Sequence, residues 1–182
     1  GKIISIDKEN KNYRIISSGH RNAQGIFYDK TNNIIFNAEH GPRGGDEINI
    51  NATPDKDIKN YGWPISSYGE HYIGEKFTVE EIYELAPLYK SHKEYNFVEP
   101  KKYFVPSIGI SQIIKNEEFI KIKDKIILYV AAMGFDIEEG DMSVHQIIFD
   151  KNLVEEQHNI LEIGERIRDM IYVEELNKIF LF

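Results

Sequence analysis

Short β-branched and aromatic runs, each bounded by Asn, Asp, Lys or Gly, recur along the chain and most restrict how it can fold. Runs of this length and composition are typical of β-strands. We expect strands at residues 26–28, 34–37, 113–114, 126–131, 146–149, 170–173 and 179–182. A polar and aromatic stretch, Lys90–Lys102, is expected to be a long loop. These patterns predict an all-β chain.

A single short helix is expected over Val79–Tyr89. Thr78 and Glu81 have the spacing of a capping box at its start. Pro87 should end or kink the helix, because proline cannot donate the backbone hydrogen bond of a helix interior. The helix would therefore be an insertion between strands.

A weak internal repeat indicates how the strands are arranged. Residues 26–36 and 171–181 both read as strand, polar turn and strand, and Arg21 and Arg166 precede them by the same offset. The units start 145 residues apart, at 26 and 171, or about three blades at the ~40–50 residues per blade of propeller repeats. Equivalent positions of propeller blades lie on one face, so Arg21 and Arg166 should converge. A β-sandwich with a repeated hairpin is the alternative.

The composition excludes several classes of protein. The chain has 182 residues, which suits one domain or part of one, and a net charge of −8. This charge argues against a general nucleic-acid binder, which needs a basic face. There is no apolar run of the ~18 residues that a membrane span needs. The absence of Cys excludes disulfides, thiolate metal sites and Cys nucleophiles.

The few arginines point to recognition of an anion. There are 5 Arg against 17 Lys, and four of the arginines lie in glycine-rich or charged motifs: Arg21, Arg43, Arg166 and Arg168. The planar guanidinium binds carboxylate or phosphate in a bidentate way. Structural pairs between these arginines and nearby carboxylates are the alternative.

Two glycine-rich blocks, residues 19–25 and 39–49, carry the most chemistry. The first combines arginine with Asn and Gln, which suits a planar, oxygen-rich ligand. The second offers open backbone carbonyls and the carboxylates of Asp46 and Glu47, the oxygen ligands that calcium takes. Either block could instead be a turn held by its own hydrogen bonds. A zinc site on His40 and His71 lacks a supporting ligand spacing.

Three further motifs are weaker. Residues 60–64 read as a packed aromatic corner whose carbonyls could serve a metal. Ser107 offers a ligand hydroxyl but has no general base at readable spacing. On a strand, Arg166 and Arg168 would point to one side and need an anion or carboxylates between them. Solvated edge charges are the alternative there.

In this order, the blocks 19–25, 39–49, 60–68, 103–109 and 165–169 resemble the glucose/sorbosone dehydrogenase family, soluble quinoproteins that use pyrroloquinoline quinone (PQQ). The resemblance implies a six-bladed β-propeller of four-stranded antiparallel blades, with residues 1–182 as a single-domain C-terminal portion. It implies hydride transfer from the anomeric carbon of an aldose to PQQ, which gives a lactone. An external electron acceptor and a periplasmic or secreted location are also implied.

The resemblance assigns the polar groups of PQQ to Arg21, Asn22, Gln24, Ser107, Arg166 and Arg168. Arg21 would stabilise the charge that develops on the quinone oxygen. The carbonyls of Gly41 and Pro42 would bind the calcium that polarises the quinone. Glu47 and the Tyr61 carbonyl would be ligands of a second, structural calcium.

Two departures from the family pattern leave a second function open. The histidine general base of the family lies in N-terminal blades that this chain lacks, and His20 belongs to a different motif. Gly134 stands near the position of a cofactor-binding lysine and is followed by an acidic insertion, residues 136–141. We therefore expect the chain alone to be inactive. The alternative is a non-catalytic, calcium-stabilised propeller that binds a sugar or a protein.

Overall fold

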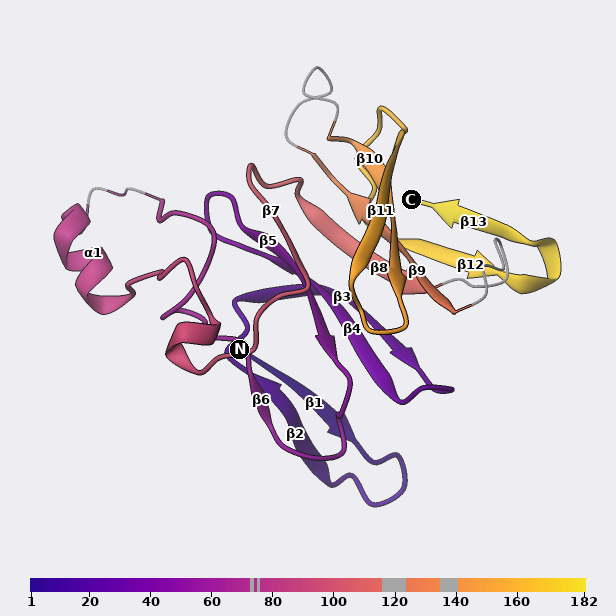
Figure 1. Ribbon diagram of the computed structural model, residues 1–182, viewed down its shortest axis with the longest axis horizontal. Helices are drawn as coiled ribbons and strands as arrows, with labels where there is room; N and C mark the ends of the chain where they lie inside the picture. The colour runs from indigo at the N-terminus through magenta and orange to yellow at the C-terminus, as the bar shows by residue number, and fades with distance from the viewer. Residues whose placement is uncertain (73, 75, 116–123, 135–140) are drawn as a thin grey trace.

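Four small sheets follow one another along the chain (Figure 1). The computed structural model describes residues 1–72, 74, 76–115, 124–134 and 141–182. The first sheet contains β1 (Lys2–Ile6), β2 (Tyr13–Ser18) and β6 (Lys59–Asn60), and β6 runs parallel to β2. The last sheet is the antiparallel hairpin of β12 (Met170–Val173) and β13 (Lys178–Leu181).

The two central sheets each have four antiparallel strands, as expected for propeller blades. One contains β3 (Asn22–Asp29), β4 (Ile34–His40), β5 (Asp46–Asn51) and β7 (Lys102–Phe104). The other is a meander of β8 (Ile110–Lys115), β9 (Lys125–Ala132), β10 (Ser143–Asp150) and β11 (Glu155–Glu162). The predicted all-β, partial propeller is confirmed.

The meander blade is buried on both faces, which explains its long apolar strands. Along β9, Leu128 and Val130 face a core shared with the preceding blade, whereas Ile127 and Tyr129 face a second core shared with β12. This alternation follows from the two-residue period of a strand. Burial of both faces therefore requires apolar residues at nearly every position of β9.

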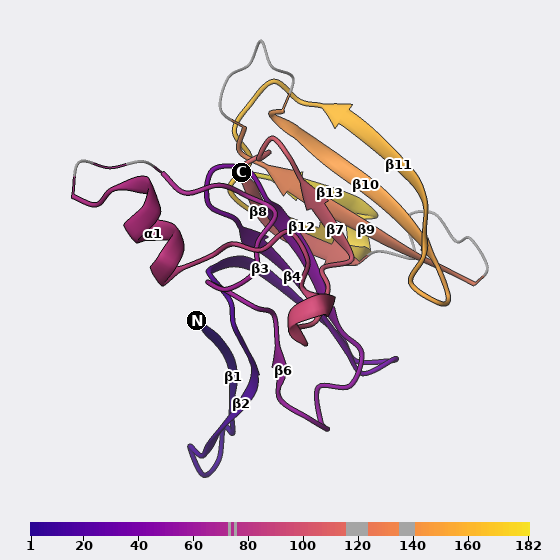
Figure 2. The ribbon, with the colours of Figure 1, turned by 60° about the vertical axis from the view of Figure 1, so that its left-hand side comes forward.

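The first strands of successive sheets lie next to one another. β3 contacts β8, and β8 contacts β12 (Figure 2). This is the packing of inner strands around a propeller axis. The segments that precede β3, β8 and β12 therefore lie at one face of the molecule.

The internal repeat is present in the structure, with a register one residue different from that expected. Tyr28 Oη donates to Asn33 Oδ1 at 2.9 Å, and Tyr172 Oη donates to Asn177 Oδ1 at 3.0 Å. Both asparagines have positive φ, 55° and 49°. The two hairpins are therefore related by 144 residues, and Arg166 is equivalent to the residue after Arg21.

A long insertion between β6 and β7 carries the helix α1 (Val79–Leu85) and the 3-10 turn Lys93–Tyr95. The capping box between Thr78 and Glu81 is present. The helix ends four residues before the expected Tyr89, because the residue before Pro87 is driven out of helical geometry. In the described part of the chain, no helix has the length and apolarity that crossing a membrane requires.

A pair of histidines lies at the seam between the two central blades. His145 Nδ1 and His158 Nε2 are 2.8 Å apart, and Phe104 of the neighbouring blade meets both rings edge-on. His145 is buried. Burial, then the charges of His158 and Lys102, lower the pKa of His145 to about 4. The folded state therefore prefers the neutral imidazole.

A depressed histidine pKa predicts acid sensitivity. The stability that comes from neutral His145 is present above pH ~6.5 and is lost as the pH falls toward ~4, with a slope of roughly 1 kcal/mol per pH unit. We expect His145→Gln to flatten this part of the profile. Denaturant unfolding from pH 7 to pH 4 measures the effect, and parallel profiles of the two proteins would contradict it.

Candidate functional site

The expected site residues come from loops at one edge of the sheets. Arg21 directly precedes β3, Ser107 lies before β8, and Arg166 lies before β12. Because neighbouring strands are antiparallel, the ends of β4 and β9 return to this same edge. They bring Gly41 and Gly134 to it.

A cavity of about 250 Å³ lies at this edge, and we call it the cleft. Its lining residues are His40, Gly41, Pro42, Tyr72, Ser107, Gly109, Met133, Gly134 and Arg166. Segments far apart in the sequence thus meet in one concave site. Four of the expected ligand residues lie in it: Gly41, Pro42, Ser107 and Arg166.

Arg21 does not line the cleft itself, but it lines a neighbouring small cavity together with His40 and Gly41, which line both. Its guanidinium Nη1 donates to the carbonyl of His40 at 3.3 Å and lies over the Trp63 ring, with Cζ 5.4 Å from the ring centroid. Trp63 thus supports an arginine rather than only closing an aromatic corner. Arg21 and Arg166 converge only in part. Each lines a cavity together with residues at the end of β4 and in the turn that follows it.

The buried carboxylate of Asp46 ties the loops of the cleft together. Its Oδ1 accepts from Ser107 Oγ at 2.7 Å and from the Gly41 amide at 3.1 Å, and its Oδ2 accepts from the Ile110 amide at 3.0 Å. Burial alone would raise the Asp46 pKa, but the nearby His40 ring, 3.7 Å away, and the hydrogen bonds from Ile110 and Ser107 outweigh it and hold the pKa below its ordinary value. Both carboxylate oxygens of Asp46 therefore help to position the loops.

The two C-terminal arginines are not on a strand, contrary to expectation; they lie in the loop before β12. Arg166 Nη1 donates to the carbonyl of Gly134 at 3.2 Å, and Arg168 Nη1 contacts Met133 Sδ at 3.6 Å. The loop brings both side chains to the end of β9. Both are exposed and carry no carboxylate partner within ion-pairing distance among the described residues.

Asn22 and Gln24 lie on β3 itself rather than in the turn before it. Gln24 Nε2 donates to Asn22 Oδ1 at 2.8 Å, and both side chains are exposed. Neither residue lines the cleft. In this conformation the structure does not bring them together with Ser107 and Arg166.

Gly134 occupies a crowded position with a left-handed backbone, where a side chain would be strained. Its φ is 61°, and a Cβ atom there would lie 2.3 Å from Asp141 Oδ1 and 2.8 Å from Met142 Cγ. The position at which we expect one cofactor cation to be missing is thus a crowded one. Of the acidic insertion, only Asp141 is among the described residues.

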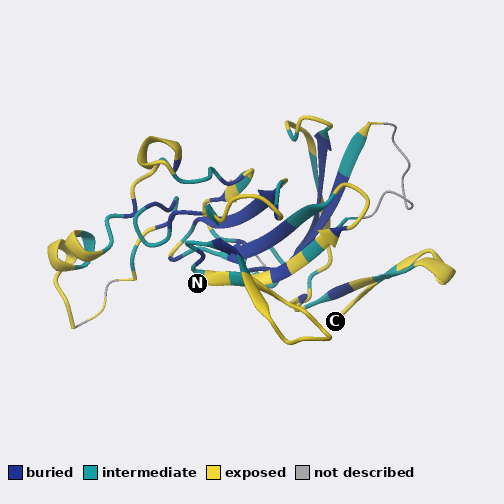
Figure 3. Cartoon of the chain, turned by 90° about the horizontal axis from the view of Figure 1, so that it is seen from below, coloured by how far each residue is buried: buried dark blue, intermediate teal, exposed yellow. Residues whose placement is uncertain are grey.

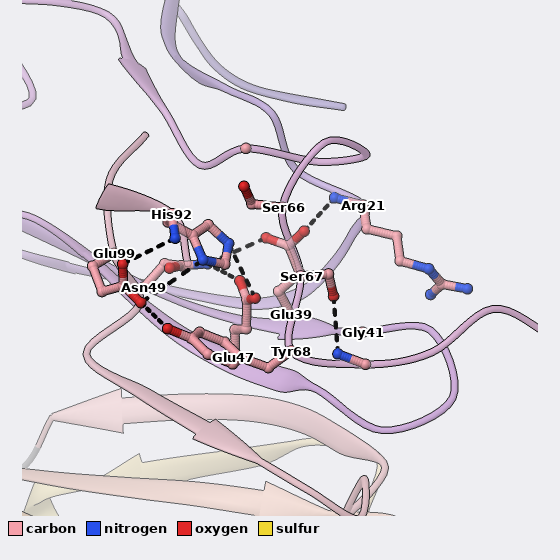
Figure 4. A network of polar contacts seen from close by, with 12 residues as sticks. Arg21, Glu39, Gly41, Glu47, Asn49, Ser66, Ser67, Tyr68, His92 and Glu99 are labelled. Carbon is pink, nitrogen blue, oxygen red and sulfur yellow. Dashed lines mark hydrogen bonds and ion pairs between the residues drawn. The ribbon is translucent and has the colours of Figure 1, made fainter. Parts of the chain in front are cut away.

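A second polar cluster lies behind the cleft. Glu39 and Glu47 face each other directly across β4 and β5, and they are only 3% and 7% exposed. Like charges at opposed positions destabilise a sheet. Glu39 is paired with His20, Nδ1 to Oε2 2.7 Å, whereas Glu47 accepts from Asn49 Nδ2 at 3.2 Å and lies 3.6 Å from Nε2 of His92, whose pKa is lowered by burial. Burial, and then the charge of Glu39, raise the pKa of Glu47 to about 8 (Figure 4).

Several buried polar atoms around this pair have no hydrogen-bond partner in the described structure. They are Asn49 Oδ1, Tyr61 Oη and both ring nitrogens of His92. A small cavity of about 10 Å³ is lined by Glu39, Glu47, Tyr61, Ser66 and Ser67, among others. Oxygen atoms around a space of this size fit a hard cation such as calcium.

A zinc site on His40 and His71 gains no support. Within the described ranges, no group of three or more His, Cys, Asp or Glu side chains is arranged to hold a metal ion. His71 Nε2 donates to the Ala86 carbonyl, 2.7 Å away, in the helical insertion. A calcium ion would need backbone or amide oxygens in addition to the carboxylates.

No sequence motif indicated His92 and Glu99, which lie in the stretch Lys90–Lys102 that was expected to be a loop. The Glu99 carboxylate accepts from the amides of His92 and Lys93, at 3.1 and 3.0 Å, and from the hydroxyl of Tyr68. These residues are 40 or more positions from Glu47 in the sequence. No local pattern could have placed them beside it.

The model of the family described as glucose/sorbosone dehydrogenase matches residues 4–180. The chain belongs to this family. Among characterised relatives, it is 33% identical over 158 residues to the aldose sugar dehydrogenase YliI of Escherichia coli K12, an alignment covering 86% of this chain and 37% of the relative. The chain thus spans less than half the length of this relative.

Solved structures agree with this assignment. A glucose dehydrogenase crystal structure superposes with a TM-score of 0.68 at 26% identity, covering 96% of this chain and 45% of the other. The apo-form of the soluble aldose sugar dehydrogenase of Escherichia coli gives 0.62 at 27%, with the same coverage. The PQQ-bound aldose sugar dehydrogenase of Streptomyces coelicolor shares the fold, at 0.53 and 20%, covering 86% and 35%.

The raised pKa of Glu47 predicts that, when a chelator keeps cations away, the free energy of unfolding depends on pH. The stability that comes from protonated Glu47 is complete below pH ~4.5 and is lost as the pH rises toward ~8, at roughly 1 kcal/mol per pH unit. Glu47→Gln should abolish this slope, and Glu84→Gln on the exposed face of α1 should keep it. Urea unfolding between pH 5 and pH 9 in EDTA tests this; an unchanged slope in Glu47→Gln would refute it.

The crowding around Gly134 predicts that adding a side chain at this position destabilises the protein. Gly134→Ala should lower the free energy of unfolding by about 1–3 kcal/mol, since the new Cβ must displace Asp141 and the residue must keep a positive φ. Gly74→Ala is the matched control, because no atom lies within 4 Å of its added Cβ. Equal stability of the two variants, measured by thermal unfolding, would show that Asp141 moves freely.

Proposed function

We propose that this chain is the cofactor-binding part of a PQQ- and calcium-dependent dehydrogenase that oxidises aldoses at the anomeric carbon to lactones. The convergence of Ser107, Arg166 and the Gly41–Pro42 turn in one cleft carries the proposal. The related enzymes are aldose and glucose dehydrogenases, and one structure of the same fold is a PQQ-bound enzyme. Residues 1–182 would act as a single C-terminal portion of a longer propeller.

The chemistry of the cleft fits an anionic, oxygen-rich cofactor. None of the cleft residues defined above is Asp or Glu, and Arg166 contributes a guanidinium. Arg166 and Arg168 would form ion pairs with the carboxylates of PQQ, and Ser107 would bind another of its oxygens. The carbonyls of Gly41 and Pro42 would hold the calcium ion. Asn22 and Gln24, which lie outside the cleft, would contribute Asn22 Nδ2 and Gln24 Oε1, the atoms that their mutual hydrogen bond does not use.

The residues around Arg21 are arranged to hold its charge in place. The Arg21 amide donates to Glu39, and its guanidinium is held by the His40 carbonyl and the Trp63 ring. Bound PQQ would accept the hydride of the sugar. Arg21 would stabilise the negative charge that develops on a quinone oxygen, which is the larger part of such catalysis.

The general base is proposed to lie outside these residues. His20 cannot take the role as it stands, because both ring nitrogens are engaged: Nδ1 with Glu39 at 2.7 Å and Nε2 with Ser17 at 2.8 Å. It is 2% exposed. A buried imidazole with both nitrogens bonded has no free lone pair for a substrate hydroxyl.

A structural calcium is proposed at the second cluster, with Glu47 and the Tyr61 carbonyl as ligands. The opposed carboxylates and the unpaired oxygen of Asn49 support it. A divalent cation would remove the repulsion that raises the Glu47 pKa. An external electron acceptor and a periplasmic or secreted location complete the proposal.

The second candidate is a non-catalytic, calcium-stabilised propeller that binds a sugar or a protein. The closed position at Gly134 favours it, since one cofactor cation is missing. The retained arginines favour the enzyme. The two candidates differ in whether sugar reduces a dye.

The test is dye reduction with PQQ, calcium and a panel of aldoses by the full-length propeller of which residues 1–182 would be the C-terminal portion, because these residues alone are expected to be inactive. Arg21→Ala should lower kcat by about 10²–10³-fold while PQQ binding, followed by absorbance, persists. Arg14→Ala, an exposed arginine paired with Asp55, is the control and should leave kcat unchanged. Calcium binding without any dye reduction would reject the enzyme and leave the binding protein.

A further inference from the structure

The helix α1 is displayed on the surface instead of packing into the core. None of its residues is buried, and Figures 1 and 3 show it standing away from the sheets. Large apolar side chains are exposed around it: Tyr72 by 65%, Phe77 by 45%, Val79 by 44% and Leu85 by 72%. We call Tyr72 together with Lys76–Leu85 the projection. Exposed apolar groups gathered in this way mark interaction sites.

The projection is held in place by polar contacts at its base. The capping box fixes the start of the helix. At the end of the helix, His71 bonds the Ala86 carbonyl at 2.7 Å and meets the Tyr83 ring edge-on at 4.8 Å. Tyr83 in turn bonds Glu70, which pairs with Lys90 at 2.8 Å. A helix without a buried face is thus presented in a defined orientation.

The base of the projection is joined directly to the loop that walls the cleft. Arg43 and Glu70 exchange two backbone hydrogen bonds of 2.8 Å. Gly45 lies so close to Gly69 that a Cβ on Gly45 would be 2.3 Å from the Gly69 amide nitrogen. Tyr72 itself lines the cleft. The projection therefore begins at the mouth of the proposed cofactor site.

The charge of the projection indicates what kind of partner it can bind. Glu80, Glu81 and Glu84 are exposed on the helix, and Lys76 is the one basic residue of the projection. Such a surface repels a second copy of itself, nucleic acid and anionic lipid. Apolar groups that share a helix with exposed carboxylates are complementary to a basic protein, which the carboxylates would also steer toward the site.

We propose that the projection docks a basic protein that carries a one-electron redox centre and takes electrons from the cleft. This inference rests on the proposed function. Oxidation of an aldose to its lactone releases two electrons and two protons. Each turnover therefore reduces two molecules of a one-electron acceptor and returns two protons to water. Weak, small interfaces are typical of such electron-transfer encounters.

Two double variants with the same change of net charge provide the test. Glu80→Lys with Glu84→Lys reverses the projection, and Glu174→Lys with Glu175→Lys reverses the exposed turn between β12 and β13. Glu81 is left unchanged because it belongs to the capping box. The probes are cytochrome c, a basic haem protein, and a small neutral dye. Each probe is offered to the PQQ-loaded full-length protein together with aldose at low ionic strength.

We expect the projection variant to reduce cytochrome c at least tenfold more slowly than the β12–β13 variant, with a weaker salt dependence. Dye reduction should be unchanged in both. Equal loss in both variants would mean that only the net charge matters, and no loss in either would exclude docking here. If no protein reduces the dye, the proposed function fails. Sedimentation of oxidised cytochrome c with each variant then still decides the docking surface, because complex formation should be lost only in the projection variant.

Discussion

The contact between the inner strands β3, β8 and β12 is the constraint on which the site depends. Each strand begins at the same face, so the segments before them meet although 145 residues separate Arg21 from Arg166. The antiparallel partners β4 and β9 return to the same edge with Gly41 and Gly134. Asp46 then joins two of these loops by hydrogen bonds. The cleft is thus a consequence of blade packing.

Behind the cleft, two buried carboxylates create an electrostatic problem that a cation would resolve. Glu39 has His20 as a close partner, whereas Glu47 has a hydrogen bond from Asn49 at 3.2 Å and only the buried imidazole of His92, at 3.6 Å, as a basic neighbour. A raised pKa is the response of such a carboxyl in the absence of a cation. The same β4–β5 pair positions the amide of Arg21 through Glu39. A cation bound at Glu47 would therefore lie on the same strand pair that positions the proposed catalytic arginine.

The sequence predicted most of the apolar strands and the motifs of the cleft, because both are local patterns. It missed β5, whose Asp, Glu and Asn residues read as a loop but are all buried in a central strand. It also missed β1, β2 and β11, which have exposed or mixed faces. The contacts of His92 and Glu99 with the carboxylate cluster come from tertiary packing of a long insertion. No periodicity in the sequence reports such contacts.

The most direct test of the central claim is a crystal structure of the protein grown with PQQ and calcium. The account predicts PQQ in the cleft between Ser107 and Arg166, a calcium ion on the Gly41 and Pro42 carbonyls, and a second ion at Glu47. Density for PQQ elsewhere, or an empty cleft with calcium only beside Glu47, would contradict it. The latter result would establish a calcium-stabilised propeller without the cofactor.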